Sequence, residues 1–321
     1  MRALVYTGPE TLEFRDFDDP DLSSGDELIK IERVGICGSD MHAYLGHDPR
    51  RNPPLILGHE ACGVTSDGRR VTINPMVVDG TSREAKAKRE NLDRNRSMMS
   101  IPPRQGSFAE YASMRKENLI AVPDGVDPAK AALAEPLACG WHAVRMGLEV
   151  GWIENPKTLV IGGGPIGVGT ALSAAAMGVS DITVTEPNDL RRDFLSKNCG
   201  FRVLPELDAD DSYDLVIDAV GYAATRETAS KAVVPGGVIM HIGLGGGDPG
   251  LDVRRFTLHE VTFIGTYAYT YQDFRDTAAA IFDGSLGALD WTEERPLADG
   301  HRAFEDIRAG KVAAPKIVLV P

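Results

Sequence analysis

The feature that most constrains the fold is a glycine-rich turn in the middle of the chain. The apolar run 158–161 precedes it, the small-residue run 168–176 follows it, and the turn itself is Gly162-Gly163-Gly164-Pro165-Ile166-Gly167. A strand, a glycine turn and a helix in this order are typical of a sheet that binds a dinucleotide, and the glycine pattern has weight only in that context. The sequence therefore predicts a parallel α/β sheet here.

Strands and helices are expected to alternate beyond this turn. The expected strands are 158–161, 182–185, 215–219, 238–242 and 261–264, and the expected helices lie near 166–177, 189–198 and 223–233. This alternation predicts a doubly wound parallel sheet covered by helices on both faces. Residues 201–204 are expected to form an edge strand followed by a loop, because the nine residues before Asp214 are too few for a full crossover.

The two ends of the chain show a different pattern. Residues 1–125 contain mainly short strand candidates, and residues 128–149 are a helix candidate. The C-terminal part is expected to end in a helix near 301–309 and a strand at 316–320. With 321 residues, the chain is long enough for two domains of ordinary size.

Composition argues against several classes of protein. Hydrophobic residues make up 43% and charged residues 25%, as in ordinary globular proteins, and the net charge of −13 disfavours nucleic-acid binding. No apolar run is long enough to span a membrane, and residues 1–6 are expected to form a strand rather than a signal peptide. The four cysteines have no paired spacing, which predicts no disulfide framework and a cytoplasmic location.

Two short strings near the N-terminus hold the side chains that zinc prefers. Residues 37–42 supply a thiol, a hydroxyl, a carboxylate and an imidazole, and the second string is Gly58-His59-Glu60. Cys, His and a carboxylate can form a three-ligand set with one position open, which distinguishes a catalytic zinc from a structural one. Each string alone is weak evidence, because a lone Cys is usually a small buried residue.

Five motifs together resemble those of one enzyme family. They are residues 35–42, 58–60, 135–137, 162–167 and 314–319. In order and spacing they are similar to the zinc-dependent medium-chain alcohol dehydrogenases, above all the branch of sorbitol, threonine and butanediol dehydrogenases. The resemblance implies a β-rich GroES-like catalytic domain, formed by residues 1–135 and 267–321. It also implies a Rossmann domain that binds NAD, residues 136–266, inserted between them.

The resemblance further implies one catalytic zinc. Cys37 and His59 correspond to zinc ligands. The residue at the position of Glu60 is a direct ligand in some members and lies behind the ligands in others. Glu135 stands where many members have a third protein ligand. Either glutamate can therefore be the third zinc ligand, and both are candidate catalytic residues. Asp40 is expected to orient the zinc-binding imidazole, to cap a helix that starts near residue 41, or to do both.

A proton relay is expected beside the metal. Ser39 is short enough to accept the proton of an alcohol, and His42 can pass it to solvent because imidazole titrates near neutrality. The alternative for His42 is an ordinary residue of the helix. Four further residues, Tyr44, His47, Trp141 and Tyr267, are candidates for the pocket lining and equally for the core or the surface.

The glycine turn also predicts how the cofactor is bound. Gly162 permits the tight turn, Gly164 lets the backbone approach the pyrophosphate, and Gly167 lets the helix pack on the sheet. Glu186 follows the second strand, where a carboxylate accepts the ribose hydroxyl of NAD and repels the phosphate of NADP, although Arg191 nearby can accommodate that phosphate. The remaining expected contacts with the cofactor are Pro165, Ile166, Val220, Gly243, Leu244 and Tyr267.

The chain departs from the family at the lobe formed by residues 79–97. Many members hold a second, structural zinc there through four cysteines, and the matching positions are Asp79, Ser82, Ala85 and Asp93. Structural zinc sites require four protein ligands that leave no coordination position open, and these four residues do not supply them. We therefore expect only the catalytic zinc, one per chain. The basic residues of 81–97 are interpreted as a solvated loop or an oligomer contact rather than a nucleic-acid patch.

The leading hypothesis is an oxidoreductase that transfers a hydride between a zinc-bound secondary alcohol or polyol, or the matching ketone, and NAD. Two alternatives stay open: a zinc-free quinone or enone reductase of the same superfamily, and a non-catalytic protein that binds NAD(H). The expected partners are a small alcohol or polyol and further copies of the chain in a homodimer or homotetramer, with no nucleic acid and no membrane. The substrate itself does not follow from the sequence.

Overall fold

The computed structural model describes residues 1–22, 25–247 and 249–321. The chain divides into two compact units. The β-rich unit comprises residues 1–135, 270–284 and 292–321, and the parallel-sheet unit comprises residues 136–269 and 285–291. No helix in the described residues has both the length and the apolar character needed to cross a membrane.

The β-rich unit is built on two larger sheets and a short hairpin. The sheets have the strand orders β2-β1-β4 and β10-β6-β5-β3-β18-β17, with β9 also paired to β3, and the hairpin is β7-β8. The strands are β1 (Arg2–Gly8), β2 (Thr11–Asp16), β3 (Glu27–Gly35), β4 (Leu55–Ile56), β5 (Glu60–Thr65), β6 (Arg70–Ile73), β7 (Met76–Val77), β8 (Ser97–Met98), β9 (Tyr111–Met114), β10 (Leu119–Ala121), β17 (Thr292–Pro296) and β18 (Lys316–Val320). The helices are α1 (Gly38–Tyr44), α2 (Arg83–Lys86), α3 (Pro128–Ala131), α9 (Tyr271–Phe282) and α10 (Gly300–Arg308), with short 3-10 turns η1 (Glu90–Leu92), η2 (Lys116–Asn118) and η3 (Leu297–Asp299).

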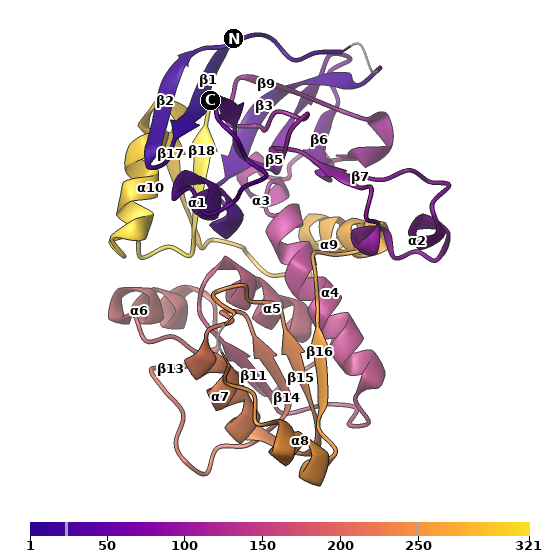
Figure 1. The fold of residues 1–321 in the computed structure, drawn as a ribbon, viewed down its shortest axis with the longest axis vertical. Coiled ribbons are helices and arrows are strands. Elements are labelled where there is room, and N and C mark those ends of the chain that lie inside the picture. The colour runs from indigo at the N-terminus through magenta and orange to yellow at the C-terminus, as the bar shows by residue number, and fades with distance from the viewer. Residues whose placement is uncertain (23–24, 248) are drawn as a thin grey trace. The chain divides into compact units, whose positions relative to one another are not determined.

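The last strand of the chain completes the larger sheet. β18 is antiparallel to β3, with Val318 opposite Gly35, and parallel to β17. Figure 1 shows this yellow strand among the indigo strands from the start of the chain. Residues 316–319 of β18 are buried although successive side chains point to opposite faces, so both faces are covered there, which explains the apolar run that begins at residue 317.

The helix expected at 128–149 is instead two helices, and this correction has a local cause. α3 begins at Pro128 behind the capping carboxylate of Asp127, and α4 runs from Ala134 to Val150. Pro136 has no N–H and clashes with the carbonyl four residues earlier in a helix, so it is tolerated only in a first turn. A helix that restarts at Ala134 places Pro136 in its first turn.

The parallel-sheet unit has the strand order β13-β12-β11-β14-β15-β16, with every neighbouring pair parallel. Its strands are β11 (Thr158–Ile161), β12 (Ile182–Thr185), β13 (Arg202–Leu204), β14 (Tyr213–Asp218), β15 (Val233–His241) and β16 (Thr262–Gly265). Its helices are α5 (Pro165–Ala176), α6 (Asp189–Asn198), α7 (Ala223–Ala232) and α8 (Val253–His259), together with α4 from Pro136 onward. Numbered within the unit, this is the order 3-2-1-4-5-6 of the Rossmann fold.

Alternating residues of the central strands pack into two different cores. Val160 and Ile217 belong to one hydrophobic cluster, and their neighbours Leu159 and Val216 belong to the other. Successive strand residues point to opposite faces, so this alternation shows that the sheet is covered on both sides. The predicted doubly wound sheet is confirmed, and so is the edge position of residues 202–204, which a loop joins to β14.

Candidate functional site

The thiol of Cys37 lies at the point where β3 ends and α1 begins. Cys37 is the N-cap of α1: its sulfur accepts a hydrogen bond from the Ser39 N–H at 3.5 Å. The carboxylate of Asp40 accepts the Cys37 N–H at 3.0 Å and so completes a capping box. Asp40 is therefore the third residue of α1 and not its N-cap, so the expectation that the helix starts near residue 41 was wrong. Asp40 still helps to cap the helix, through its hydrogen bond with the Cys37 N–H.

Asp40 also contacts the imidazole of His59. Asp40 Oδ1 lies 3.5 Å from His59 Nδ1, and it accepts the Gly58 N–H at 3.2 Å. Burial raises the pKa of Asp40, but the charges of His59 and Arg51 and the hydrogen bonds it accepts outweigh burial, so this pKa lies below its ordinary value. Because an ionised carboxylate only accepts, it holds the proton on Nδ1 and leaves Nε2 as the nitrogen for a metal.

His59 and Cys37 lie next to each other. Burial lowers the pKa of His59, but the negative charges of Asp40 and Cys37 and hydrogen bonds to both raise it well above its ordinary value. The ring is only 5% exposed. A half-buried thiol and a buried imidazole, the two donors that zinc prefers, therefore lie side by side.

The Glu60 carboxylate is held by a lysine that the sequence interpretation assigned no role. Lys316 Nζ lies 2.6 and 2.7 Å from the two carboxylate oxygens and donates to the Ile36 carbonyl at 2.8 Å. Both side chains are buried. A Cβ at Gly35 would collide with this carboxylate, so the glycine makes room for the ion pair. The sequence signal was a lysine that opens an apolar strand.

Lys316 also locates the second glutamate. Burial lowers the pKa of Lys316, whereas the charges of Glu60, Cys37 and Glu135 raise it, and the net pKa lies above its ordinary value. The charges of the thiol and of both carboxylates therefore act on one ammonium group. Glu135 is buried at the start of α4.

A thiol, an imidazole and a carboxylate are donors that fit zinc in chemistry. In the described ranges, no three His, Cys, Asp or Glu side chains are grouped so that they could hold a metal ion. Glu60 is engaged by Lys316, and Glu135 is the nearby carboxylate outside that ion pair. The ligand set of Cys37, His59 and one of the two glutamates stays a prediction.

The two residues predicted to form the proton relay lie on α1. Ser39 is half-buried, and His42 is exposed one helical turn later, with its ring centroid 6.3 Å from that of His47. Tyr44, one of the candidates for the pocket lining, is instead a core residue that packs on Phe304 with the ring centroids 5.2 Å apart.

The residues expected at the cofactor all follow the carboxyl ends of parallel strands. The glycine turn follows β11, Glu186 follows β12, Val220 follows β14, Gly243 and Leu244 follow β15, and Tyr267 follows β16. The carboxyl edge is where open α/β sheets bind their ligands. The backbone N–H groups of Val220 and Gly221 donate to the buried carboxylate of Asp218, which fixes the loop after β14.

The glycine turn has the geometry that an anion site needs. Gly162 has a φ of +101°, and a Cβ at Gly167 would collide with the Gly162 carbonyl oxygen. Gly164 is the N-cap of α5, Pro165 occupies the first turn, and no side chain caps this end. The first N–H groups of a 12-residue helix are thus left for a bound phosphate.

Glu186 supports this turn directly. Its two carboxylate oxygens accept the Gly163 N–H at 3.0 Å and the Asn188 N–H at 2.8 Å. The side chain is only 7% exposed. Arg191 is half-buried at the start of α6, and its N–H donates to the capping side chain of Asn188. The carboxylate predicted to select NAD therefore also holds the glycine turn in place.

Hydrogen bonds and a capped helix organise the lobe 79–97. Asp79 accepts the N–H and hydroxyl of Thr81, and the hydroxyl of Ser82 caps α2 by accepting the Ala85 N–H at 3.0 Å. Asp93 is buried and accepts the Asn95 N–H. Thus Asp79, Ser82 and Asp93 act as turn and cap residues at the positions where cysteines would bind a metal.

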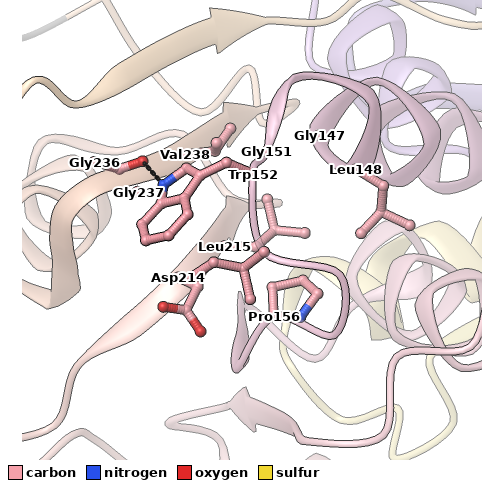
Figure 2. Close-up of a pocket in the computed structure, with 11 residues that line it drawn as sticks. Gly147, Leu148, Gly151, Trp152, Pro156, Asp214, Leu215, Gly236, Gly237 and Val238 are labelled. Carbon is pink, nitrogen blue, oxygen red and sulfur yellow. Dashed lines mark hydrogen bonds between the residues drawn. The ribbon is translucent and has the colours of Figure 1, made fainter.

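A pocket in the parallel-sheet unit lies away from the residues expected to bind the cofactor. It is lined by the end of α4, the segment 151–156 and the starts of β14 and β15 (Figure 2). The indole of Trp152 donates to the Gly236 carbonyl at 3.1 Å. Since the pocket lies at the amino edge of the sheet, it is not the cofactor site.

Comparisons with known proteins agree with this geometry. The family described as "Alcohol dehydrogenase GroES-like domain" matches residues 23–124, and the family described as "Zinc-binding dehydrogenase" matches residues 165–283. The chain belongs to the zinc-type medium-chain alcohol dehydrogenases. This membership confirms the resemblance inferred from the five motifs and the GroES-like and Rossmann fold class.

Relatives of this dehydrogenase cover almost its whole length. L-galactonate-5-dehydrogenase of Escherichia coli is 29% identical, with 95% of this chain and 94% of the relative aligned. (R,R)-butanediol dehydrogenase of Saccharomyces cerevisiae is 29% identical over 100% of this chain and 98% of its own. The structure of acetophenone reductase from Geotrichum candidum, solved with NAD, has a TM-score of 0.86 and 26% identity, covering 100% of this chain and 97% of the other.

Proposed function

We propose that this protein oxidises a secondary alcohol or polyol, or reduces the matching ketone, with NAD as the hydride carrier and one catalytic zinc. The observation that supports the proposal most is the half-buried Cys37 thiol beside a buried imidazole whose Nδ1 faces Asp40. The same chain holds an uncapped glycine-turn helix for the dinucleotide. L-galactonate-5-dehydrogenase and (R,R)-butanediol dehydrogenase are named for small molecules that bear hydroxyl groups, which supports this substrate class.

The chain's own residues prepare the site for this reaction. Cys37, His59 and one of Glu60 and Glu135 would hold the zinc, which when bound supplies a Lewis acid that lowers the pKa of an alcohol. Bound NAD would supply the hydride acceptor. Asp40 orients His59, Ser39 accepts the alcohol proton, and exposed His42 passes it to water. The turn 162–167 and Glu186 would hold the pyrophosphate and ribose.

A substrate screen combined with metal analysis tests the proposal. We expect one zinc per chain after dialysis, and alcohol-dependent formation of NADH with at least one polyol, sugar or secondary alcohol. Two tightly held zinc ions would contradict the interpretation of residues 79–93. Reduction of quinones or enones by protein that contains no zinc would favour the zinc-free reductase. Tight NAD binding with no turnover of any substrate would favour a non-catalytic role.

Glu186 is proposed to select NAD over NADP. Removing its charge in Glu186→Gln should shift the ratio of kcat/KM for NADP to that for NAD upward by roughly tenfold or more, because a like-charge contact at about 4 Å costs on the order of 1 kcal/mol even in bulk water and more near a protein surface. Glutamine keeps one oxygen that can accept the Gly163 N–H and loses the acceptor for the Asn188 N–H, whereas Glu186→Ala removes the charge and both acceptors. A wild-type protein that already prefers NADP would show that this assignment is wrong.

We also propose that the protein forms a homodimer or homotetramer in the cytoplasm. β16 is the edge strand of its sheet, with β15 as its neighbour, and the adjacent α8 exposes Val253 and Leu258 by 66% and 64%. An open strand edge beside exposed apolar residues suits a second copy of the chain. Light scattering should give a mass of two or four chains, and Leu258→Lys should lower it. A monomeric wild type would contradict the proposal.

In the described residues the four cysteines form no disulfide with one another, which supports the proposed location.

A further inference from the structure

A buried arginine and a buried serine lie directly behind the proposed zinc ligands. The guanidinium of Arg51 donates from Nε to the Ser100 carbonyl at 2.9 Å and from Nη2 to the Ser100 hydroxyl at 3.1 Å. Its Nη1 donates to the Ser39 carbonyl at 2.6 Å. Arg51 is 5% exposed and Ser100 is fully buried. One rigid cation therefore joins the proposed relay helix to a distant loop.

The serine in turn contacts the proposed metal ligand. Ser100 Oγ lies 3.4 Å from His59 Nδ1, on the same ring nitrogen that faces Asp40 Oδ1 at 3.5 Å. Two oxygens thus approach one nitrogen of the ring. A rotation or a flip of the imidazole would lose both contacts. Because Arg51 is donor-only, it orients the Ser100 hydroxyl by occupying one of its lone pairs.

The backbone of Ser100 indicates that its hydroxyl is needed. Its φ is +62°, in the left-handed region that glycine adopts freely and other residues adopt at a cost. Glycine would suit this turn better by backbone criteria alone. The three hydrogen bonds from Arg51 span both sides of the site and keep the strained residue in place.

We propose that Arg51 and Ser100 are positioning residues for the metal site, which set the orientation of His59 and the place of Ser39. The inference rests on the proposed function, since it assumes that His59 binds the metal. Partners of this kind behind a metal-binding histidine typically change metal affinity 10- to 100-fold. Lysine cannot replace Arg51, because only the planar guanidinium reaches the three acceptors together.

Titration of the metal-free protein with Co²⁺, followed by its visible and thiolate charge-transfer absorption, tests the proposal. We expect Ser100→Ala and Ser100→Gly to weaken Co²⁺ binding by roughly 10- to 100-fold. Ser100→Gly should nevertheless unfold at a higher temperature than Ser100→Ala, because glycine relieves the positive φ. Arg51→Lys should weaken binding similarly. Arg50→Lys, a change in the neighbouring exposed arginine that pairs with Asp48 and keeps its charge beside that carboxylate, should bind as wild type does.

The two serine variants separate positioning from plain stability. If Co²⁺ affinity follows the melting temperature, so that Ser100→Gly binds as tightly as wild type, the proposal is overturned and Ser100 is only a structural residue. Unchanged binding in Arg51→Lys would also overturn it. Failure of the wild-type protein itself to bind Co²⁺ with a thiolate signature would instead reject the metal site of the proposed function.

Discussion

Cys37→Ser should remove both the zinc and the turnover while leaving the fold and NAD binding unchanged. Serine is an effective N-cap, so the hydrogen bond to the Ser39 N–H that begins α1 is kept. It supplies no thiolate, however, and the chain would lose its softest metal donor. The Lewis acid contributes several kcal/mol, so kcat should fall on the order of 10³-fold.

The measurements are zinc content, kcat and NAD affinity on the same preparation. NAD affinity should stay within about a factor of two, because the residues predicted to bind it belong to the parallel-sheet unit. Cys199→Ser is the matched control, since Cys199 ends α6 in that unit and should lose neither zinc nor activity. Full alcohol oxidation by a folded, zinc-free Cys37→Ser protein would exclude zinc from the mechanism.

Lys316→Met should destabilise the β-rich unit by about 3–5 kcal/mol, the usual cost of removing one partner from a buried ion pair. Lys316 and Glu60 are 2% and 0% exposed, and the lysine satisfies both carboxylate oxygens. Methionine fills much of the same volume, so the loss reflects the uncompensated carboxylate more than a cavity. Hydrogen exchange of the β5 and β18 amides in metal-free protein measures it.

A double variant isolates the ion pair from general damage. Glu60→Gln combined with Lys316→Met removes both charges, so exchange in β5 and β18 should be slower than in Lys316→Met alone. The amides of β11 in the other unit are the internal control and should not change. Strictly additive effects of the two substitutions would show that the two side chains stabilise the fold independently of each other.

Local sequence patterns predicted much of the parallel-sheet unit. Gly162 and Gly167 occupy positions where a backbone conformation or a close contact excludes a side chain, and such requirements are visible in a few consecutive residues. The same holds for the edge strand at 202–204, because the length of a connection limits the topology. The break between α3 and α4 was not predicted, although Pro136 indicates it, because proline is tolerated only in the first turn of a helix.

The surroundings of the candidate metal site depend on the tertiary structure. Cys37 and His59 were recognisable by residue type and motif, but Lys316 lies 256 residues from Glu60 in the chain and reaches it only because β18 pairs with β3. Arg51 and Ser100, 49 residues apart, meet for a similar reason. Hydrophobic periodicity and turn residues give information only about residues that are close together in the sequence. Which charge compensates a buried carboxylate, or which hydroxyl faces an imidazole, is decided when distant strands and loops pack together.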